Sequence, residues 1–341
     1  MQSVITGFIA TTVPLLMYGI ASWTRWRLVG GIATVLIAIS AAFGLGVMGF
    51  SDLWVVPVGI GMDQTLILLA LWVVFGAVAR TAGPLNIPGP PLLVSMIMGA
   101  TLGEVPAAAI LGASARDAKG GARLALAAAG GGMIGRVGDP ALLVLTESRP
   151  DLLVFLAPLG LLCALLARPR KEDLIVGDEQ NRTRTLLVAA VALLALVPGM
   201  APYALGVGII GLGALASDRR GPIEIGGSLW NVGAIVLGII AIVGGGVEQA
   251  AVGLEWGQEL GGMWGAPALT LVVAILTALT DATAMSVIGQ GIVDRALSLD
   301  SMAVVPAMAA GIAVGGLAPL IAARALRAGW KLWLGQVGLA I

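Results

Sequence analysis

The segment GATLGEVPAAAILGASA, residues 99–115, places one acidic side chain, Glu104, in the middle of a stretch that otherwise suits lipid. Counted over residues 88–115, an arm of roughly 11–15 residues lies on either side of Gly103–Glu104, and at about 1.5 Å per residue it reaches only about 16–22 Å. A hydrocarbon core is roughly 30 Å thick. Residues 88–115 are therefore predicted to form a re-entrant hairpin whose tip stops near the middle of a membrane.

The whole chain has the composition of an integral membrane protein. Of its 341 residues, 58% are hydrophobic and only 11% are charged, and its mean hydropathy is +1.00, unlike soluble globular domains. Apolar runs of spanning length recur from end to end, so we expect an all-α polytopic membrane protein with about nine spanning helices. Its 50 glycines are typical of closely packed and broken helices.

The residue types that the chain lacks exclude several classes of function. The sequence has no histidine, and its single cysteine, Cys163, lies in an apolar run, which excludes disulfides and thiolate metal sites. Nineteen basic and nineteen acidic residues cancel, so no nucleic-acid partner is implied. No Ser/His/Asp set, phosphate-binding loop or dinucleotide motif is present. We therefore expect no enzymatic activity, no cofactor and no metal beyond a transported ion.

The distribution of Lys and Arg predicts the topology. Placing Arg25 and Arg27 in the cytoplasm puts nearly all other basic residues on the same side, with Arg149 and Arg295 as exceptions. The N-terminus is then outside and the C-terminus is cytoplasmic. The hydrophilic stretch 168–184 becomes a cytoplasmic linker, for which an ordinary loop is the alternative interpretation. We expect this protein in a membrane of the bacterial inner (plasma) type.

The linker divides the chain into two membrane halves, residues 1–167 and residues 185–341. The alternative to the first hairpin is a single spanning helix kinked at Pro106. That helix would reverse every later loop and place the linker outside, which the positive-inside bias opposes.

The second half contains a counterpart of the first hairpin, GAPALTLVVAILTALTDATAMSVIGQGIVD, of which residues 265–293 are predicted to form the hairpin. The two segments align without gaps, so that Pro90 matches Pro267 and Glu104 matches Asp281. A chance match of two apolar segments of low complexity is the alternative.

A glycine-broken helix is predicted after each hairpin, at residues 122–146 and at residues 301–327. The order of hairpin, acidic tip and broken helix is the same in both halves. By the loop count the second hairpin enters from the outside, so the halves form an inverted repeat, as in many secondary transporters.

The tips read LGEVP (residues 102–106) and LTDAT (279–283), and the broken helices read GGMIGRVG (131–138) and GGLAPLI (315–321). This pattern resembles the ion transporter superfamily, particularly the NhaD-type sodium/proton antiporters and the ArsB-type arsenite permeases. Members typically carry an Asp-Asn pair in each tip, where this chain has Gly-Glu and Thr-Asp. The resemblance implies ion transport at the two tips and, since relatives often pair, a homodimer.

The two tip carboxylates are the centre of the predicted site. An ionised carboxylate at bilayer depth costs at least about 2.5–3.5 kcal/mol, so it is kept only when paired, bound to a cation or protonated. Glu104 and Asp281 are expected to bind a cation and protons in competition, with Thr280, Thr283 and Asp139 as further oxygen ligands. Supporting positions in the hairpins and broken helices are Gly103, Pro106, Gly131, Gly132, Arg136, Gly138, Gly315, Gly316 and Pro319.

These residues predict a secondary active transporter that exchanges a monovalent cation, Na⁺ or Li⁺, for H⁺, with membrane lipid as its other partner. An arsenite or organic-anion permease on the same scaffold is one alternative, and a non-transporting membrane scaffold derived from a transporter is another. Arg136 either neutralises Asp139, three residues away, or attracts an anionic substrate. Glu104 and Asp281 also have a structural alternative, which is to satisfy backbone groups of the hairpins.

Overall fold

The protein is described by a computed structural model over residues 12–21, 27–46, 89–135, 145–146, 149–175, 182–197, 199–218, 233–234, 236–241, 265–295, 304–316, 334 and 337–338. Within these ranges the chain is almost entirely helical and contains no β-strand, which confirms the all-α expectation there. One isolated antiparallel bridge joins Ala115 to Leu174.

The helices of the described residues are mostly short. A helix covers Thr12–Ala21, and two 3₁₀ turns, η2 (Pro150–Leu152) and η3 (Lys171–Asp173), accompany the α-helices. The labelled α-helices are α2 (Arg27–Gly44), α4 (Pro91–Leu102), α5 (Glu104–Ala113), α6 (Ala118–Gly132), α8 (Leu153–Ala167), α9 (Arg182–Leu196), α10 (Ala201–Asp218), α13 (Gly265–Leu279), α14 (Ala282–Arg295) and α15 (Val304–Gly315).

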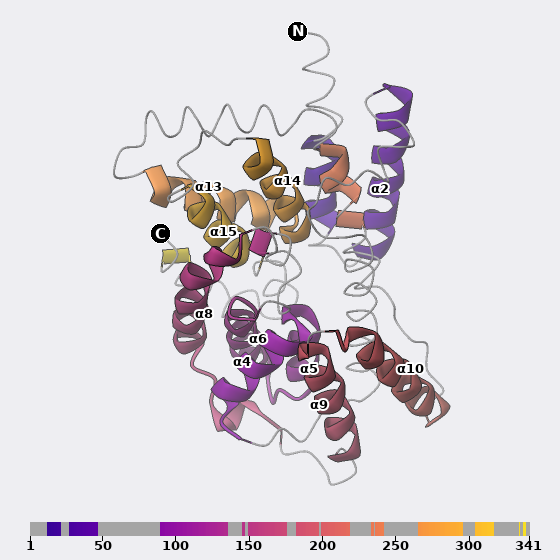
Figure 1. The fold of residues 1–341 in the computed structure, drawn as a ribbon, viewed down its shortest axis with the longest axis vertical. Helices are drawn as coiled ribbons and strands as arrows, with labels where there is room; N and C mark the ends of the chain where they lie inside the picture. The colour runs from indigo at the N-terminus through magenta and orange to yellow at the C-terminus, as the bar shows by residue number, and fades with distance from the viewer. Residues whose placement is uncertain are drawn as a thin grey trace.

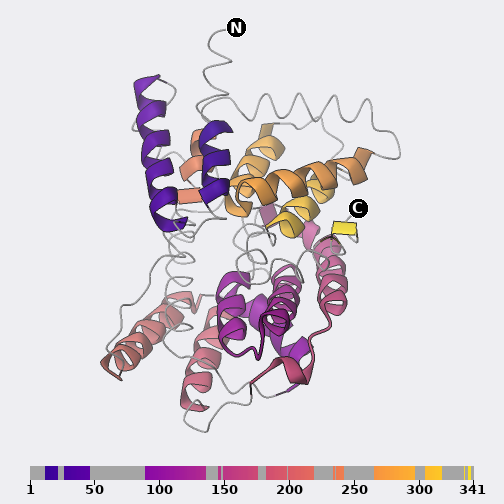
Figure 2. The ribbon, with the colours of Figure 1, turned by 180° about the vertical axis from the view of Figure 1, so that it is seen from behind.

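The helices gather into two groups (Figure 1). In one group α4, α5 and α6 lie together with α8, α9 and α10, and in the other α13, α14 and α15 lie together beside α2. Figure 2 shows the same division from behind. Helix α8 contacts both α6 and α15, so it connects the two groups.

Glycines at the end of α6 and in the turn that follows it allow the backbone to touch that of α4. A Cβ atom on Gly131 would overlap the carbonyl of Met96, and one on Gly135 would overlap the carbonyl of Ala100, so only glycine permits this approach. A Cβ atom on Gly99 of α4 would likewise overlap the carbonyl of Ala128, so the two backbones touch at several points. Helix α5, which lies between them in sequence, contacts both.

Glycines also bring the backbones of α13 and α15 into close contact. A Cβ atom on Gly311 would collide with the carbonyl of Thr270, and one on Gly315 would collide with the carbonyl of Ala274. The hydroxyl of Thr270 also donates a hydrogen bond across the contact, to the carbonyl of Ala307 at 3.2 Å. These pairs advance in one direction, so α13 and α15 run parallel and end close to each other.

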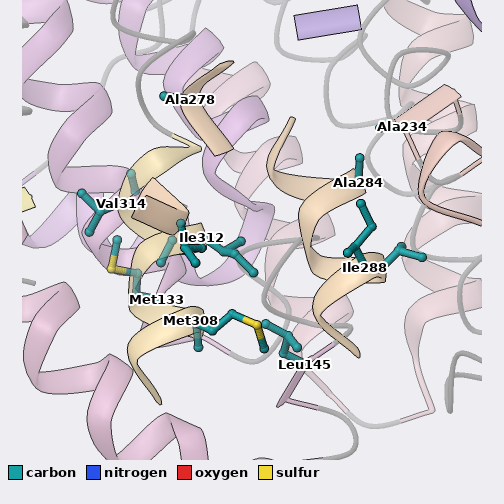
Figure 3. Close-up of a cluster of buried hydrophobic side chains, with 14 of the residues drawn as sticks. Met133, Leu145, Ala234, Ala278, Ala284, Ile288, Met308, Ile312 and Val314 are labelled. Atoms are coloured by element: carbon teal, nitrogen blue, oxygen red, sulfur yellow. The ribbon is translucent and has the colours of Figure 1, made fainter. Parts of the chain in front are cut away.

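One apolar core joins the two groups. Met133 and Leu145 from the first half belong to the same buried cluster as Ile288, Met308 and Ile312 from the second half (Figure 3). The contact between α8 and α6 adds a close backbone approach, because a side chain on either member of a glycine pair, Gly130 and Gly160, would overlap the other.

The first part of the predicted linker packs back onto the base of α5 and α6. Asp173 is buried there and accepts hydrogen bonds from the backbone N–H of Arg170 at 2.7 Å and from the guanidinium of Arg123 at 3.4 Å. The N–H of Arg116 donates to the carbonyl of Asp173 at 2.8 Å. The predicted linker is therefore anchored at its start, and its end is helical because α9 begins at Arg182.

One helical stretch among the described residues is long and apolar enough to cross a membrane. It covers Pro150–Ala167 and has a mean hydropathy of 2.1. Shorter apolar helices occur at Thr12–Ala21, Val29–Gly44, Pro91–Leu102, Pro202–Gly211, Gly265–Leu279 and Val304–Gly315.

Candidate functional site

The second predicted tip lies at an interruption between two helices. Helix α13 ends at Leu279 and α14 begins at Ala282, so Thr280 and Asp281 form the break. The Thr280 side chain is buried, and its hydroxyl donates to the carbonyl of Leu276 at 2.7 Å. The same carbonyl also accepts the backbone N–H of Thr280 at 2.9 Å, so the Thr280 hydroxyl is a second donor to it and its side chain is held against the last turn of α13.

Asp281 is the N-cap residue of α14. Its Oδ1 atom accepts hydrogen bonds from the backbone N–H groups of Thr283, at 2.8 Å, and Ala284, at 3.3 Å. These are the second and third residues of the helix, whose N–H groups have no partner within it. The side chain of Asp281 is half-buried. The structural alternative considered for this residue therefore describes a real contact, which holds the carboxylate in place.

The carboxyl end of α15 meets the same break. A Cβ atom on Gly316 would lie 2.7 Å from the Cβ atom of Ala282, and one on Gly315 would lie 2.7 Å from the Cβ atom of Thr277. Helices α13 and α15 thus end side by side next to Asp281. Each helix end carries a partial negative charge, so their convergence favours a cation.

The N-terminal helix also reaches this tip. A Cβ atom on Gly19 would overlap the carbonyl of Leu279, so the backbone of Thr12–Ala21 lies directly against the end of α13. The sequence gives no sign of this contact, because one glycine in an apolar run has no distinguishing neighbour. Gly19 is a position that sequence reasoning missed.

The first predicted tip is also a helix interruption. Helix α4 ends at Leu102, and Gly103 has φ of 91° and ψ of 154°, a conformation that side chains other than glycine rarely adopt. Glu104 is the first residue of α5. The hydroxyl of Thr101 donates to the carbonyl of Ile97 at 2.8 Å, in the same way as the Thr280 hydroxyl in the second tip.

The structure brings part of the predicted site together. Thr280, Asp281 and Thr283 lie within one turn of each other. Gly316 lies against Ala282 in the same turn, and Gly315 lies against Thr277 one turn earlier. Gly131 and Gly132 are buried at the end of α6. The positions that lie outside the described residues are Arg136, Gly138, Asp139 and Pro319, together with the side chains of Glu104 and Pro106. The predicted meeting of Glu104 with Asp281 therefore stays a prediction.

The first part of each predicted broken helix ends at its glycine pair, and residues 136–144 and 317–327 of these predictions lie outside the described residues. Helix α6 ends at Gly132, where a turn follows, and α15 ends at Gly315 with Gly316 in the turn. Helix α6 begins at Ala118, four residues before the predicted start of its segment at residue 122, because the Asp117 side chain caps it through the N–H of Gly120 at 2.6 Å.

None of the known protein-family models matches this chain, and none of the curated proteins matches it either.

Proposed function

We propose that this chain is a polytopic membrane protein that exchanges a monovalent cation, most simply Na⁺, for H⁺. The transport site is formed at the break between α13 and α14, with Asp281 as its carboxylate. In this proposal Glu104, at the corresponding break between α4 and α5, contributes the second carboxylate. The chain is a secondary transporter of the kind that the ion transporter superfamily contains.

Support for a membrane setting comes from the polarity of α8. Its outer face carries the exposed apolar side chains of Val154, Phe155, Leu161, Leu162 and Leu165, with Val154 72% exposed. A helix of a soluble protein carries polar residues on such a face, and large exposed apolar surfaces mark contact with protein or membrane. Lipid accounts for this surface on a helix of spanning length.

Helix α13 has the same inverted polarity. Leu271, Val272 and Ile275 are exposed on one side, whereas the hydroxyl-bearing Thr270 and Thr277 are buried on the other. In lipid, helices associate through small and polar residues because apolar side chains gain nothing by leaving lipid. The glycine and threonine face of α13 against α15 fits that rule.

The observation that carries the cation specificity is the convergence at Asp281. Two parallel helices present their carboxyl ends next to one carboxylate, and Thr280 adds a hydroxyl within the break. Partial negative charge, oxygen atoms and a full negative charge together form a site for a small cation. The positive N-terminus of α14 at the break is already paired with the Asp281 carboxylate.

Exchange follows from competition at that carboxylate. A carboxylate in an apolar setting is kept either by a bound cation or by a proton. A carrier that changes its open side only when the carboxylate is occupied then moves Na⁺ one way and H⁺ the other. The two glycine-packed units, α4 with α6 and α13 with α15, are suited to an inverted repeat of this kind.

The test is ion flux in proteoliposomes that contain the purified full-length chain and a trapped pH-sensitive dye. We expect NaCl or LiCl pulses to change the internal pH and choline chloride to leave it unchanged. Asp281→Asn removes the charge but keeps an oxygen that can cap α14, so it is the matched variant, and we expect it to abolish the response. Glu104→Gln is expected to do the same.

Absence of a cation response from correctly folded protein would reject the proposal. Flux of arsenite or of labelled citrate in the same vesicles would instead favour a permease. The capping bond of Asp281 supports a second candidate, a non-transporting membrane scaffold, because it gives the carboxylate a structural role without an ion. No flux of any solute, with both variants folded, is the result that this candidate expects.

A further inference from the structure

The Thr277 hydroxyl is buried without a hydrogen-bond partner. Its residue is 0% exposed, and the Oγ1 atom has no donor or acceptor within reach. Leaving a hydroxyl in this condition costs free energy, so such groups usually mark a ligand or a water. Thr277 is therefore a candidate for a function that the folded chain alone does not fulfil.

Three other buried threonine hydroxyls in the described helices make hydrogen bonds, whereas the Ser95 hydroxyl of α4 is unpartnered like that of Thr277. Thr34 and Thr101 donate to carbonyls four residues earlier in their own helices, at 2.7 Å and 2.8 Å. Thr270, on the same face of α13 and seven residues before Thr277, donates to the carbonyls of Ala266 and Ala307. The state of Thr277 is thus not a general property of threonine in these helices. Its hydroxyl forgoes a bond that its neighbours make.

The position of Thr277 is that of the proposed ion site. It lies one turn before Asp281 in the sequence, near the carboxyl end of α13, and its Cβ faces Gly315 at the carboxyl end of α15. Gly315 packs directly against Thr277, because a Cβ atom at position 315 would lie 2.7 Å from the Thr277 Cβ atom. Both helix carboxyl ends carry partial negative charge. A hydroxyl oxygen placed between them is therefore suited to bind a cation and not an anion.

We propose that the Thr277 hydroxyl oxygen is a ligand of the transported monovalent cation, which it shares with Asp281. This inference rests on the proposed function and adds a ligand to it. The hydroxyl hydrogen turns away from the ion, and the oxygen lone pairs face it. Without the cation the hydroxyl is an unpaired polar group, and binding removes that penalty.

The test compares Thr277→Val, which has nearly the same shape without the hydroxyl, with Thr277→Ser, which keeps the hydroxyl. Two quantities are measured on the full-length chain, the Na⁺ concentration that gives half of the maximal vesicle response and the melting temperature in choline chloride. We expect Thr277→Val to raise the half-maximal Na⁺ concentration about tenfold and to leave the melting temperature unchanged or higher. Thr277→Ser should stay within about threefold of the wild type.

Two control variants separate ligation from packing. Thr270→Val removes the satisfied hydroxyl of the same helix face, so it should lower the melting temperature without changing the half-maximal Na⁺ concentration. Ser95→Ala removes the other unpartnered buried hydroxyl, which lies about 12 Å along α4 from the Gly103 break, and it should change neither the Na⁺ response nor the fold.

A half-maximal Na⁺ concentration for Thr277→Val within twofold of the wild type would overturn the inference and leave the proposed function standing. A fall in the melting temperature of Thr277→Val in choline would also overturn it, because the hydroxyl would then already have a protein partner. If no cation changed the internal pH of vesicles that contain the wild-type protein, the proposed function would be refuted, and the assignment of Thr277 with it.

Discussion

Replacing Asp281 separates its two roles, capping α14 and carrying a charge. Asp281→Ala removes the acceptor of two backbone hydrogen bonds, at 2.8 Å and 3.3 Å. Loss of an N-cap side chain costs about 1 kcal/mol, within a range of roughly 0.5–2 kcal/mol. Asp281→Asn keeps an oxygen at the same place and loses only the attraction between a negative charge and the helix N-terminus, about 0.3–1 kcal/mol. We therefore expect the order of stability to be wild type, then Asn, then Ala.

The assay is thermal unfolding of detergent-purified protein, followed by tryptophan fluorescence in choline chloride. A loss of about 1 kcal/mol corresponds to a shift of roughly 2 °C in a chain of this size, which replicate melts resolve. The same preparations are then assayed for flux. We expect both variants to be inactive although they differ in stability, because transport needs the charge and the cap needs only an oxygen.

Two results would refute this reasoning. If Asp281→Ala had the same melting temperature as the wild type, the capping bonds would contribute nothing to stability and α14 would be held by other contacts. If Asp281→Asn were as unstable as Asp281→Ala, the fold itself would depend on the charge, and a loss of flux in either variant could no longer be assigned to ion binding.

Three further predictions concern packing. Gly131→Ala should prevent folding of the α4–α6 unit, which would be seen as loss of monodisperse protein on size exclusion. Gly213→Ala is the control, because a Cβ atom there would meet no atom within 4 Å. It should be neutral or stabilise the protein by up to about 1 kcal/mol. Gly103→Ala should cost about 1–2 kcal/mol because of its positive φ, measured as a lower melting temperature. Asp173→Ala should destabilise more than Arg123→Ala in the same melts, because the carboxylate also accepts a backbone N–H at 2.7 Å.

The sequence alone locates the helix breaks well. A glycine beside an acid in an apolar run, and a Thr-Asp pair in its counterpart, are positions where α4 and α13 do end. The first and last residues of the helices are predicted less well, because each helix boundary depends on caps such as Asp117 that a pattern of apolar residues does not reveal. The all-α character follows directly from composition and apolar periodicity.

The packing between helices could not be predicted. Fifty glycines offer many potential close contacts, and nothing in the sequence selects Gly315 for Ala274 or Gly19 for Leu279. The choice depends on how α13 meets α15 and the N-terminal helix in three dimensions. The unpartnered state of Thr277 is likewise invisible in sequence, because Thr270 on the same helix face has identical chemistry and makes two hydrogen bonds.

The hydrogen bonds at the second tip attach its proposed ligands to two different helices, α13 and α14. Asp281 is bonded to the first turn of α14, so it moves with that helix, whereas Thr277 belongs to α13 and Thr280 is hydrogen-bonded to it. Helix α14 packs on residues 236–241, since a side chain on Gly238 would press on Val287, and both α13 and α14 also pack on α15. A cation held by Asp281 and Thr277 together therefore links two parts of the protein, the helices α13 and α14, across the break beside the end of α15. Its binding free energy is gained only when those parts are close, and this is the condition under which an ion can shift a conformational equilibrium.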